Sequence, residues 1–173
     1  MRLLFETDLH DYGEAENVSR RPSARAIIIS GRRLALVYSS AENYYKFPGG
    51  GINEGEDIEA ALAREVREET GLIVKPESIR EFGRVMRRQK IDHLPDTVFE
   101  QENLYFLCET EERVREQSLD DYEKEAGFIL RIVDIDEAIS VNEAYHSENA
   151  FNEMMIRREE RVLRIIKTEC IDK

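Results

Sequence analysis

The chain has 173 residues, a length that fits one domain with a proper hydrophobic core and would leave two compact domains cramped. Acidic residues outnumber basic ones by 37 to 25, giving a formal net charge of −12. This field repels a polyanion such as RNA and disfavours tight non-specific binding of nucleic acid. A small phosphorylated substrate stays compatible with the charge if a metal ion neutralises it locally.

Patterns of apolar residues predict five strands. Two β-rich runs flank Gly31-Arg32-Arg33 and are expected to form a hairpin, and three later runs predict further strands. A polar loop containing Pro95 is expected between the third and fourth strands. The predicted strands are Ala24–Ser30, Leu34–Ser39, Ile79–Ile91, Glu102–Cys108 and Gly127–Val133.

Helical spacing of apolar residues predicts three helices, the first with acids at its start and Gly71 as its stop. The last has an apolar stripe whose simplest role is core packing. Its polar face mixes acids with bases, among them Arg158 and Glu159, and this mixture disfavours a membrane-surface role. The predicted helices are Asp57–Thr70, Asp134–Val141 and Ser147–Thr168.

No linker or repeat divides the sequence. We therefore expect a single domain over residues 1–173, with a core from about 22 to 141 and a C-terminal helix at about 147–168. Strands on both sides of a central helix indicate an α/β (α+β) layered sandwich. No apolar run is long enough to cross a bilayer, and Cys108 and Cys170 are expected as free thiols, so the sequence indicates a cytoplasmic protein without a membrane partner.

The helix at Asp57–Thr70 is unusual because it aims carboxylates along its apolar stripe. At 100° per residue, Glu65 and Glu69 fall within about 20° of Ile58, beside Leu62. Ordinary helices do not turn acids toward the face that packs inward. Like charges cost only tenths of a kcal/mol when solvated, but roughly 3 kcal/mol per pair when half-buried about 6 Å apart. Buried acids here would need a cation or a neutralising base.

Three carboxylates, those of Glu65, Glu68 and Glu69, lie on this helix just after the triple glycine Gly49–Gly51. Oxygen-only ligands suit Mg²⁺ or Mn²⁺, which binds one or two carboxylates together with water and phosphate oxygens. Such an ion can neutralise a diphosphate and lower the pKa of an attacking water. Arg64 lies between acids and is interpreted as a structural clamp. A plain solvated acidic face is the alternative for the three glutamates.

The spacing of these residues is that of a known pattern. Nine residues between positions 50 and 72 stand at fixed intervals: Gly50, Glu56, Arg64, Glu65, Val66, Glu68, Glu69, Gly71 and Leu72. They fill every fixed position of the 23-residue Nudix box, so that chance matching is negligible, unlike a lone glycine motif. The chain resembles the Nudix family, with the box covering about an eighth of it.

The resemblance implies a Nudix-type α/β/α sandwich with a mixed central β-sheet. It also implies a hydrolase that uses Mg²⁺ or Mn²⁺ to cleave the diphosphate bridge of a nucleoside diphosphate linked to another group. One of the three glutamates would be the base. The implied metal ligands are Glu65, Glu68, Glu69 and a backbone carbonyl at Gly50.

Further roles are implied around the box. Glu56 and Arg64 would brace the glycine loop against the helix, and Gly49 and Gly51 would lie against the substrate. The oligomeric state cannot be read from the residues, and a homodimer is only a family-level expectation. Capped or triphosphorylated RNA is the substrate class that the acidic charge favours least.

Two acids outside the box, Glu123 and Glu125, precede Gly127 in the loop from which some family members recruit another catalytic acid. A solvated loop acid is the competing interpretation for each. The sequence does not decide between these two interpretations.

Aromatic and basic residues outside the box are candidates for substrate binding. Tyr44 and Tyr45 could stack on a base or line the mouth of the site. Arg87, Arg88 and Lys90 form a basic cluster on a strand near the expected cleft. Phosphate contact and a solvated edge that blocks strand aggregation are both open for this cluster.

Three functions are compared. The leading hypothesis is a Nudix pyrophosphohydrolase acting on a small nucleotide-derived substrate through water attack at phosphorus. A non-hydrolytic domain that senses a nucleotide or ADP-ribose is the alternative, although such proteins tend to have decayed boxes. An isoprenoid-diphosphate isomerase would need a catalytic cysteine, and Cys108 has no recognisable context for that role. No second motif selects among nucleotide substrates.

Overall fold

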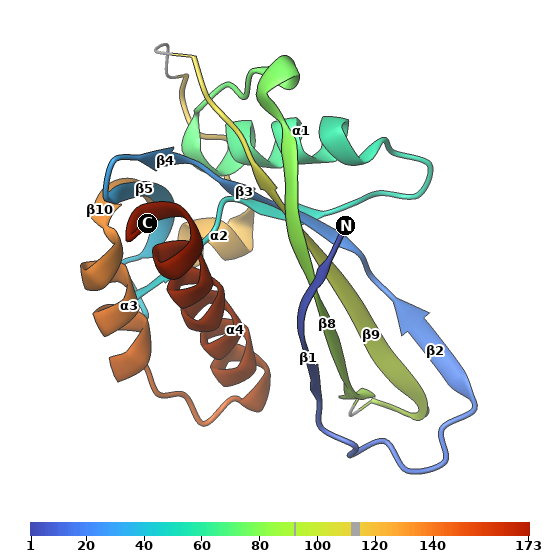
Figure 1. Ribbon diagram of the computed structural model, residues 1–173. Helices are drawn as coiled ribbons and strands as arrows, with labels where there is room; N and C mark the ends of the chain where they lie inside the picture. Colours follow the sequence, from blue (N-terminus) through green and yellow to red (C-terminus); the bar gives the residue numbers. More distant parts are fainter. Residues whose placement is uncertain (92, 112–114) are drawn as a thin grey trace.

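The computed structural model describes residues 1–91, 93–111 and 115–173. Figure 1 shows their arrangement. The strands are β1 (Leu3–Asp8), β2 (Asn17–Arg20), β3 (Ser23–Ile27), β4 (Ile29–Ser30), β5 (Arg33–Ser39), β6 (Tyr44–Lys46), β7 (Gly49–Gly51), β8 (Arg80–Ile91), β9 (Leu94–Leu107) and β10 (Phe128–Asp134). The helices are α1 (Ile58–Thr70), α2 (Asp121–Glu125), α3 (Ile135–Ala144) and α4 (Ala150–Ile166), with a 3₁₀ turn at Pro76–Ser78 and a π-helical turn at Lys167–Ile171.

Two sheets form the middle of the molecule. The larger runs in the order β1-β8-β9-β3-β7, with β2 also paired to β9, and the smaller runs in the order β10-β5-β4, with β6 paired to β5. Strand β3 lies parallel to β9 and antiparallel to β7, so the larger sheet is mixed. The predicted glycine loop is itself a short strand, because Gly49–Gly51 pairs with β3.

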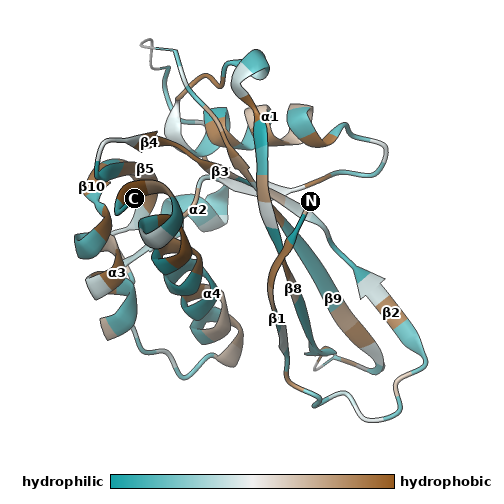
Figure 2. Cartoon of the chain, in the orientation of Figure 1, coloured by the Kyte–Doolittle hydropathy of each residue, from teal (hydrophilic) through white to brown (hydrophobic). Residues whose placement is uncertain are grey.

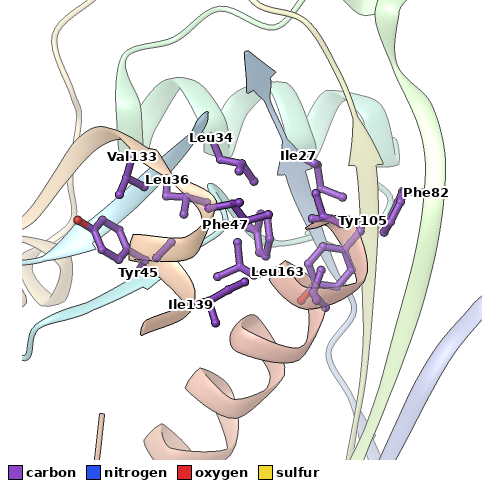
Figure 3. Close-up of a cluster of buried hydrophobic side chains, with 14 of the residues drawn as sticks. Ile27, Leu34, Leu36, Tyr45, Phe47, Phe82, Tyr105, Val133, Ile139 and Leu163 are labelled. Carbon is purple, nitrogen blue, oxygen red and sulfur yellow. The ribbon is translucent and has the colours of Figure 1, made fainter. Parts of the chain in front are cut away.

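Helices cover both faces of these strands, with α1 on one side and α3 and α4 on the other (Figure 1). On the first side, Leu62 and Val66 of α1 pack against Ala24 and Ala26 of β3. On the other, a larger cluster joins side chains from both sheets to α3 and α4 (Figure 3). The predicted α/β/α sandwich with a mixed sheet is confirmed.

Local residue chemistry sets the ends of α1. The Asp57 side chain accepts hydrogen bonds from the backbone N–H groups of Glu59 and Ala60, which otherwise lack helical partners. Gly71 ends the helix in the left-handed conformation at φ +74°, which glycine adopts without steric cost. Ile58 is exposed, so the inward stripe of α1 begins one turn later than its sequence pattern indicated.

The region around Pro95 differs from the prediction. Strand β9 begins at Leu94, so β8 and β9 form a long antiparallel hairpin. The sequence had predicted two strands joined by a loop of about ten residues. Residue 92 of that loop lies outside the described part. The polar side chains of the hairpin pair across strands, for example Glu100 with Arg88 and Arg20. Strands β1 and β2, which the sequence did not predict, flank the outer end of this hairpin (Figure 1).

Two charged residues on the polar face of helix α4 are buried, which the sequence pattern did not predict. Figure 2 shows hydrophilic and hydrophobic residues along its length. Arg158 is only 5% exposed and Glu159 is fully buried. They pair with each other, and Glu159 also accepts the backbone N–H of Phe47, so the burial of both charges is compensated.

No helix in the described ranges is long and apolar enough to cross a membrane.

The two cysteines are free thiols, as predicted, with Cys108 buried and Cys170 exposed. Burial raises the pKa of Cys108 to about 12, so its sulfur is held as the unreactive thiol at neutral pH.

Candidate active site

Arg64 of α1 forms hydrogen bonds to Glu56 in the preceding loop and to Gly51 of β7. Its Nε and Nη2 donate to the two carboxylate oxygens of Glu56 at 2.8 and 2.9 Å, and Nη2 also donates to the Gly51 carbonyl at 3.1 Å. Hydrogen bonding to Arg64 lowers the pKa of Glu56 to about 2, so this pair stays ionised at neutral pH. The loop before α1, strand β7 and the middle of α1 are thereby joined through one side chain.

Glu65 and Glu68 converge on the remaining nitrogen of Arg64. Nη1 donates to Glu65 Oε1 at 2.7 Å and lies 3.3 Å from Glu68 Oε2. Burial raises the pKa of the Glu65 carboxyl above its usual value, although Arg64 opposes this shift. Gly50 passes directly over Glu65, since a Cβ there would lie 2.5 Å from Glu65 Cδ.

Glu69 is in a different environment from the other two glutamates. Its side chain points inward and the residue is 1% exposed. Lys46 Nζ donates to its Oε1 at 2.5 Å, and the Gly49 N–H donates to its Oε2 at 2.9 Å. The inward-facing acid therefore has the neutralising base that its burial requires.

The donor chemistry fits a hard divalent cation held by two carboxylates. Glu65 and Glu68 lie within reach of one guanidinium nitrogen, and Mg²⁺ or Mn²⁺ commonly uses one or two carboxylates with water and phosphate oxygens. Among the described residues, no three acids, histidines or cysteines form a group that could hold a metal as they stand. Glu69 can join Glu65 and Glu68 only if Lys46 releases it.

The two predicted loop acids lie in different environments. Glu123 is partly buried in α2, and its carboxylate accepts the Asp120 N–H in a capping box. Burial raises its pKa, and the nearby charge of Glu69 adds to the shift, which places Glu123 close to the helix site. Glu125 is exposed on the same short helix.

A cavity of about 400 Å³ adjoins the glycine strand and extends across the larger sheet. Among the described residues, no Asp or Glu lines it, although the chain carries a net charge of −12. Its aromatic lining residues are Tyr44, Phe99, Tyr122, Phe128 and Phe151. Its cationic lining residues are Arg21, Arg25, Lys46, Arg87 and Arg158.

Of the six predicted substrate-binding residues, three line the cavity and three do not. Gly51, Tyr44 and Arg87 line it, and Tyr44 is nevertheless almost fully buried. Gly49, Tyr45 and Arg88 do not line it. Tyr45 packs in the core, with its N–H bonded to Asn142, and Arg88 pairs with Glu6 and Glu100.

Sequence reasoning missed four cations of the cavity, of which two stand in runs that predict burial. Arg25 lies within an apolar strand, and Lys46 lies between Tyr45 and Phe47. A charged residue in a buried strand requires a buried partner or ligand. Here Lys46 pairs with Glu69, and Arg25 Nη1 donates to the Gly49 carbonyl at 2.5 Å. The other two cations, Arg21 and Arg158, come from the segment before β3 and from α4.

The three-layer fold, together with a carboxylate-bearing helix braced behind a glycine strand, defines a Nudix-type α/β domain. The model of the NUDIX domain matches residues 19–155. The chain therefore belongs to the NUDIX family.

Individual relatives agree with this assignment. Nudix hydrolase 5 of Arabidopsis thaliana is 31% identical over 147 residues, which cover 80% of this chain and 43% of that protein. An RNA pyrophosphohydrolase of Haemophilus ducreyi is 59% identical over 34 residues, or 20% of this chain and 17% of that protein. The chain thus spans less than half the length of either relative. A NUDIX hydrolase structure from Nitrosomonas europaea superposes with a TM-score of 0.55 at 18% identity, covering 81% of this chain and 89% of that one, and supports the fold.

Proposed function

We propose that this chain is a divalent-metal-dependent pyrophosphohydrolase that cleaves the diphosphate bridge of a nucleoside diphosphate linked to another group. The observation that carries the proposal is the convergence of Glu65 and Glu68 on Arg64, next to a cavity lined by cations and aromatic rings. Such a cavity suits a substrate that combines phosphates with a planar base.

Different residues would bind the metal ion and activate the water. Glu65 and Glu68 would hold Mg²⁺ or Mn²⁺, and this ion would neutralise charge on the phosphate oxygens. Glu65 is also a candidate base through the carboxylate oxygen that the ion leaves free, and burial raises the pKa of this carboxyl in the metal-free protein. Glu123 is the second candidate base, since its pKa is also raised beside Glu69.

Lys46 and Arg25 are the cations proposed to bind the diphosphate. Both lie beside the glycine strand, Lys46 through its contact with Glu69 and Arg25 through its contact with the Gly49 carbonyl. Both also line the cavity. Cations at this position would favour the charge that develops on the phosphate oxygens during the reaction.

A panel of nucleotide substrates tests the proposal. Nucleoside triphosphates, ADP-ribose, dinucleoside polyphosphates and sugar nucleotides are incubated with the protein in Mg²⁺ or Mn²⁺, and released nucleoside monophosphate or phosphate is measured. We expect turnover of at least one class, and its loss in EDTA. Tight binding of a nucleotide without cleavage in either metal would contradict the proposal and favour a sensing domain.

Alanine substitutions at two neighbouring glycines should have different effects, one on activity and the other on stability. A Cβ at Gly50 would collide with the movable Glu65 side chain, so Gly50→Ala should lower kcat about tenfold or more with little change in melting temperature. At Gly49, where φ is +135°, a Cβ would lie 2.9 Å from Arg25 Cα, so Gly49→Ala should lower the free energy of unfolding by about 3 kcal/mol. Equal effects of the two variants on stability would contradict this placement of Glu65.

A further inference from the structure

Arg87 is a buried cation at the far end of the cavity from the glycine strand. It lies on β8, is 2% exposed and lines the cavity. Its guanidinium carbon lies 4.2 Å from the ring centre of Phe151 and 6.0 Å from that of Phe99. The two ring centres lie 6.4 Å apart, so both rings pack against the guanidinium from neighbouring directions and shield part of it from water.

The charge of Arg87 is not balanced within the described part of the chain. Its Nε and Nη2 donate to Gln89 Oε1, which is neutral, and its Nη1 is buried without a hydrogen-bond partner. Burial lowers the pKa of Arg87 to about 10, which leaves the group charged at neutral pH. Arg158, in the same cavity and also buried, is by contrast paired with Glu159. A buried guanidinium with a free donor matches an anion brought by a ligand.

The backbone of Arg87 lies well away from the glycine strand beside the helix site. Strands β7, β3, β9 and β8 are successive neighbours in the sheet. Three steps of about 4.8 Å place the backbone of Arg87 roughly 14 Å from that of Gly51. The register adds to this separation, because Gly51 aligns through Ser23 with Asn103, whereas Arg87 aligns with Gln101. The two ends of the cavity therefore contact different parts of a bound molecule.

We propose that Arg87 binds a second anionic group, a phosphate or a carboxylate, carried by the substrate at a distance from its diphosphate. Phe99 and Phe151 pack against the guanidinium, and Nη1 donates to this anion. The preferred substrates are then nucleotides with an additional charged group. This inference rests on the proposed function, because it takes the cavity as the substrate site.

Matched nucleotide pairs test the proposal. NADPH against NADH adds one phosphate, and UDP-glucuronate against UDP-glucose adds one carboxylate. Dissociation constants are measured by calorimetry with Ca²⁺ in place of Mg²⁺, and hydrolysis is followed separately in Mg²⁺. We expect the charged member of at least one pair to bind tenfold or more tightly, and the pair concerned identifies phosphate or carboxylate.

The preference should depend on Arg87 specifically. Arg87→Gln should abolish it, whereas Arg87→Lys should retain part of it. Arg80→Gln removes the same charge from an exposed position on the same strand and should retain all of it. Absence of a preference in the wild-type chain, or an unchanged preference in Arg87→Gln, would overturn the proposal.

A measurement on the wild-type chain covers the case in which Arg87→Gln does not fold. The Arg87 Nε–H resonance, identified by its absence from Arg87→Lys, should shift with the charged member of the preferred pair and stay in place with the neutral one. Equal shifts with both members would overturn the proposal. A preference for the charged member without hydrolysis would leave the inference standing and remove the proposed function. Hydrolysis without a preference for the charged member would support the proposed function and overturn the inference about Arg87.

Discussion

Glu68→Gln should lower kcat by about 10²-fold or more and leave the fold intact. The substitution keeps the shape of the side chain and removes a charge that the proposed site uses to hold a cation against the phosphates. Glu68 is partly exposed and its contact with Arg64 is long at 3.3 Å, so the melting temperature should change little. The measurement is steady-state hydrolysis in Mg²⁺ of the substrate found in the nucleotide panel.

Glu59→Gln is the matched control for this variant. Glu59 lies on the same helix, is exposed and makes no side-chain hydrogen bond or ion pair among the described residues. It loses the same charge, so its kcat should equal that of the wild type. Similar losses in both variants would show that bulk charge, and not the α1 site, controls the rate. Near-wild-type turnover of Glu68→Gln would remove α1 as the active site.

Lys46→Met should lower the free energy of unfolding by about 3–5 kcal/mol at neutral pH. It removes the counter-charge of Glu69, which is almost fully buried, and leaves that carboxylate with only the Gly49 N–H. For a domain of this size the change corresponds to a fall of about 10 °C in melting temperature. Chemical denaturation of the metal-free protein, followed by circular dichroism, measures it.

A double variant and a surface control isolate the cause. Adding Glu69→Leu to Lys46→Met removes the unpaired charge and should restore much of the lost stability. Lys124→Met, which removes an exposed lysine, should change stability by less than about 1 kcal/mol. If the double variant were less stable than Lys46→Met alone, the unpaired charge would not be the cause.

The helix, its ends and its inward-facing acid could be predicted because they depend on local sequence. Fixed spacing on α1 determines that Glu65, Glu68 and Glu69 share one side, and Asp57 and Gly71 determine where the helix begins and ends. The Nudix resemblance then gave the family and the layered fold. The burial of Glu69 could be predicted because it lies at nearly the same angle around the helix as Leu62. The sequence also predicted that a buried acid here needs a cation or a base, and Lys46 is that base.

The cavity could not be predicted because its cations come from four separate elements and the segment before β3. Arg87 lies on β8, Arg158 on α4, Lys46 on β6 and Arg25 on β3. Only the sheet order brings them together, and that order depends on pairings between residues far apart in the chain. Arg158 and Glu159 have the residue types of a solvated helix face, and only their mutual pairing makes burial acceptable. The first part of strand β9 was missed because Pro95 and the polar residues beside it are typical of a loop.

The most direct test of the central claim is hydrolysis in water labelled with ¹⁸O. The preferred nucleotide is incubated with the wild-type chain and Mg²⁺, and the products are analysed by mass spectrometry. Water attack at phosphorus predicts two phosphorylated products, one of which carries a single ¹⁸O atom. Products free of label, or an intact nucleotide that the protein binds without cleaving, would contradict the assignment of this chain as a pyrophosphohydrolase.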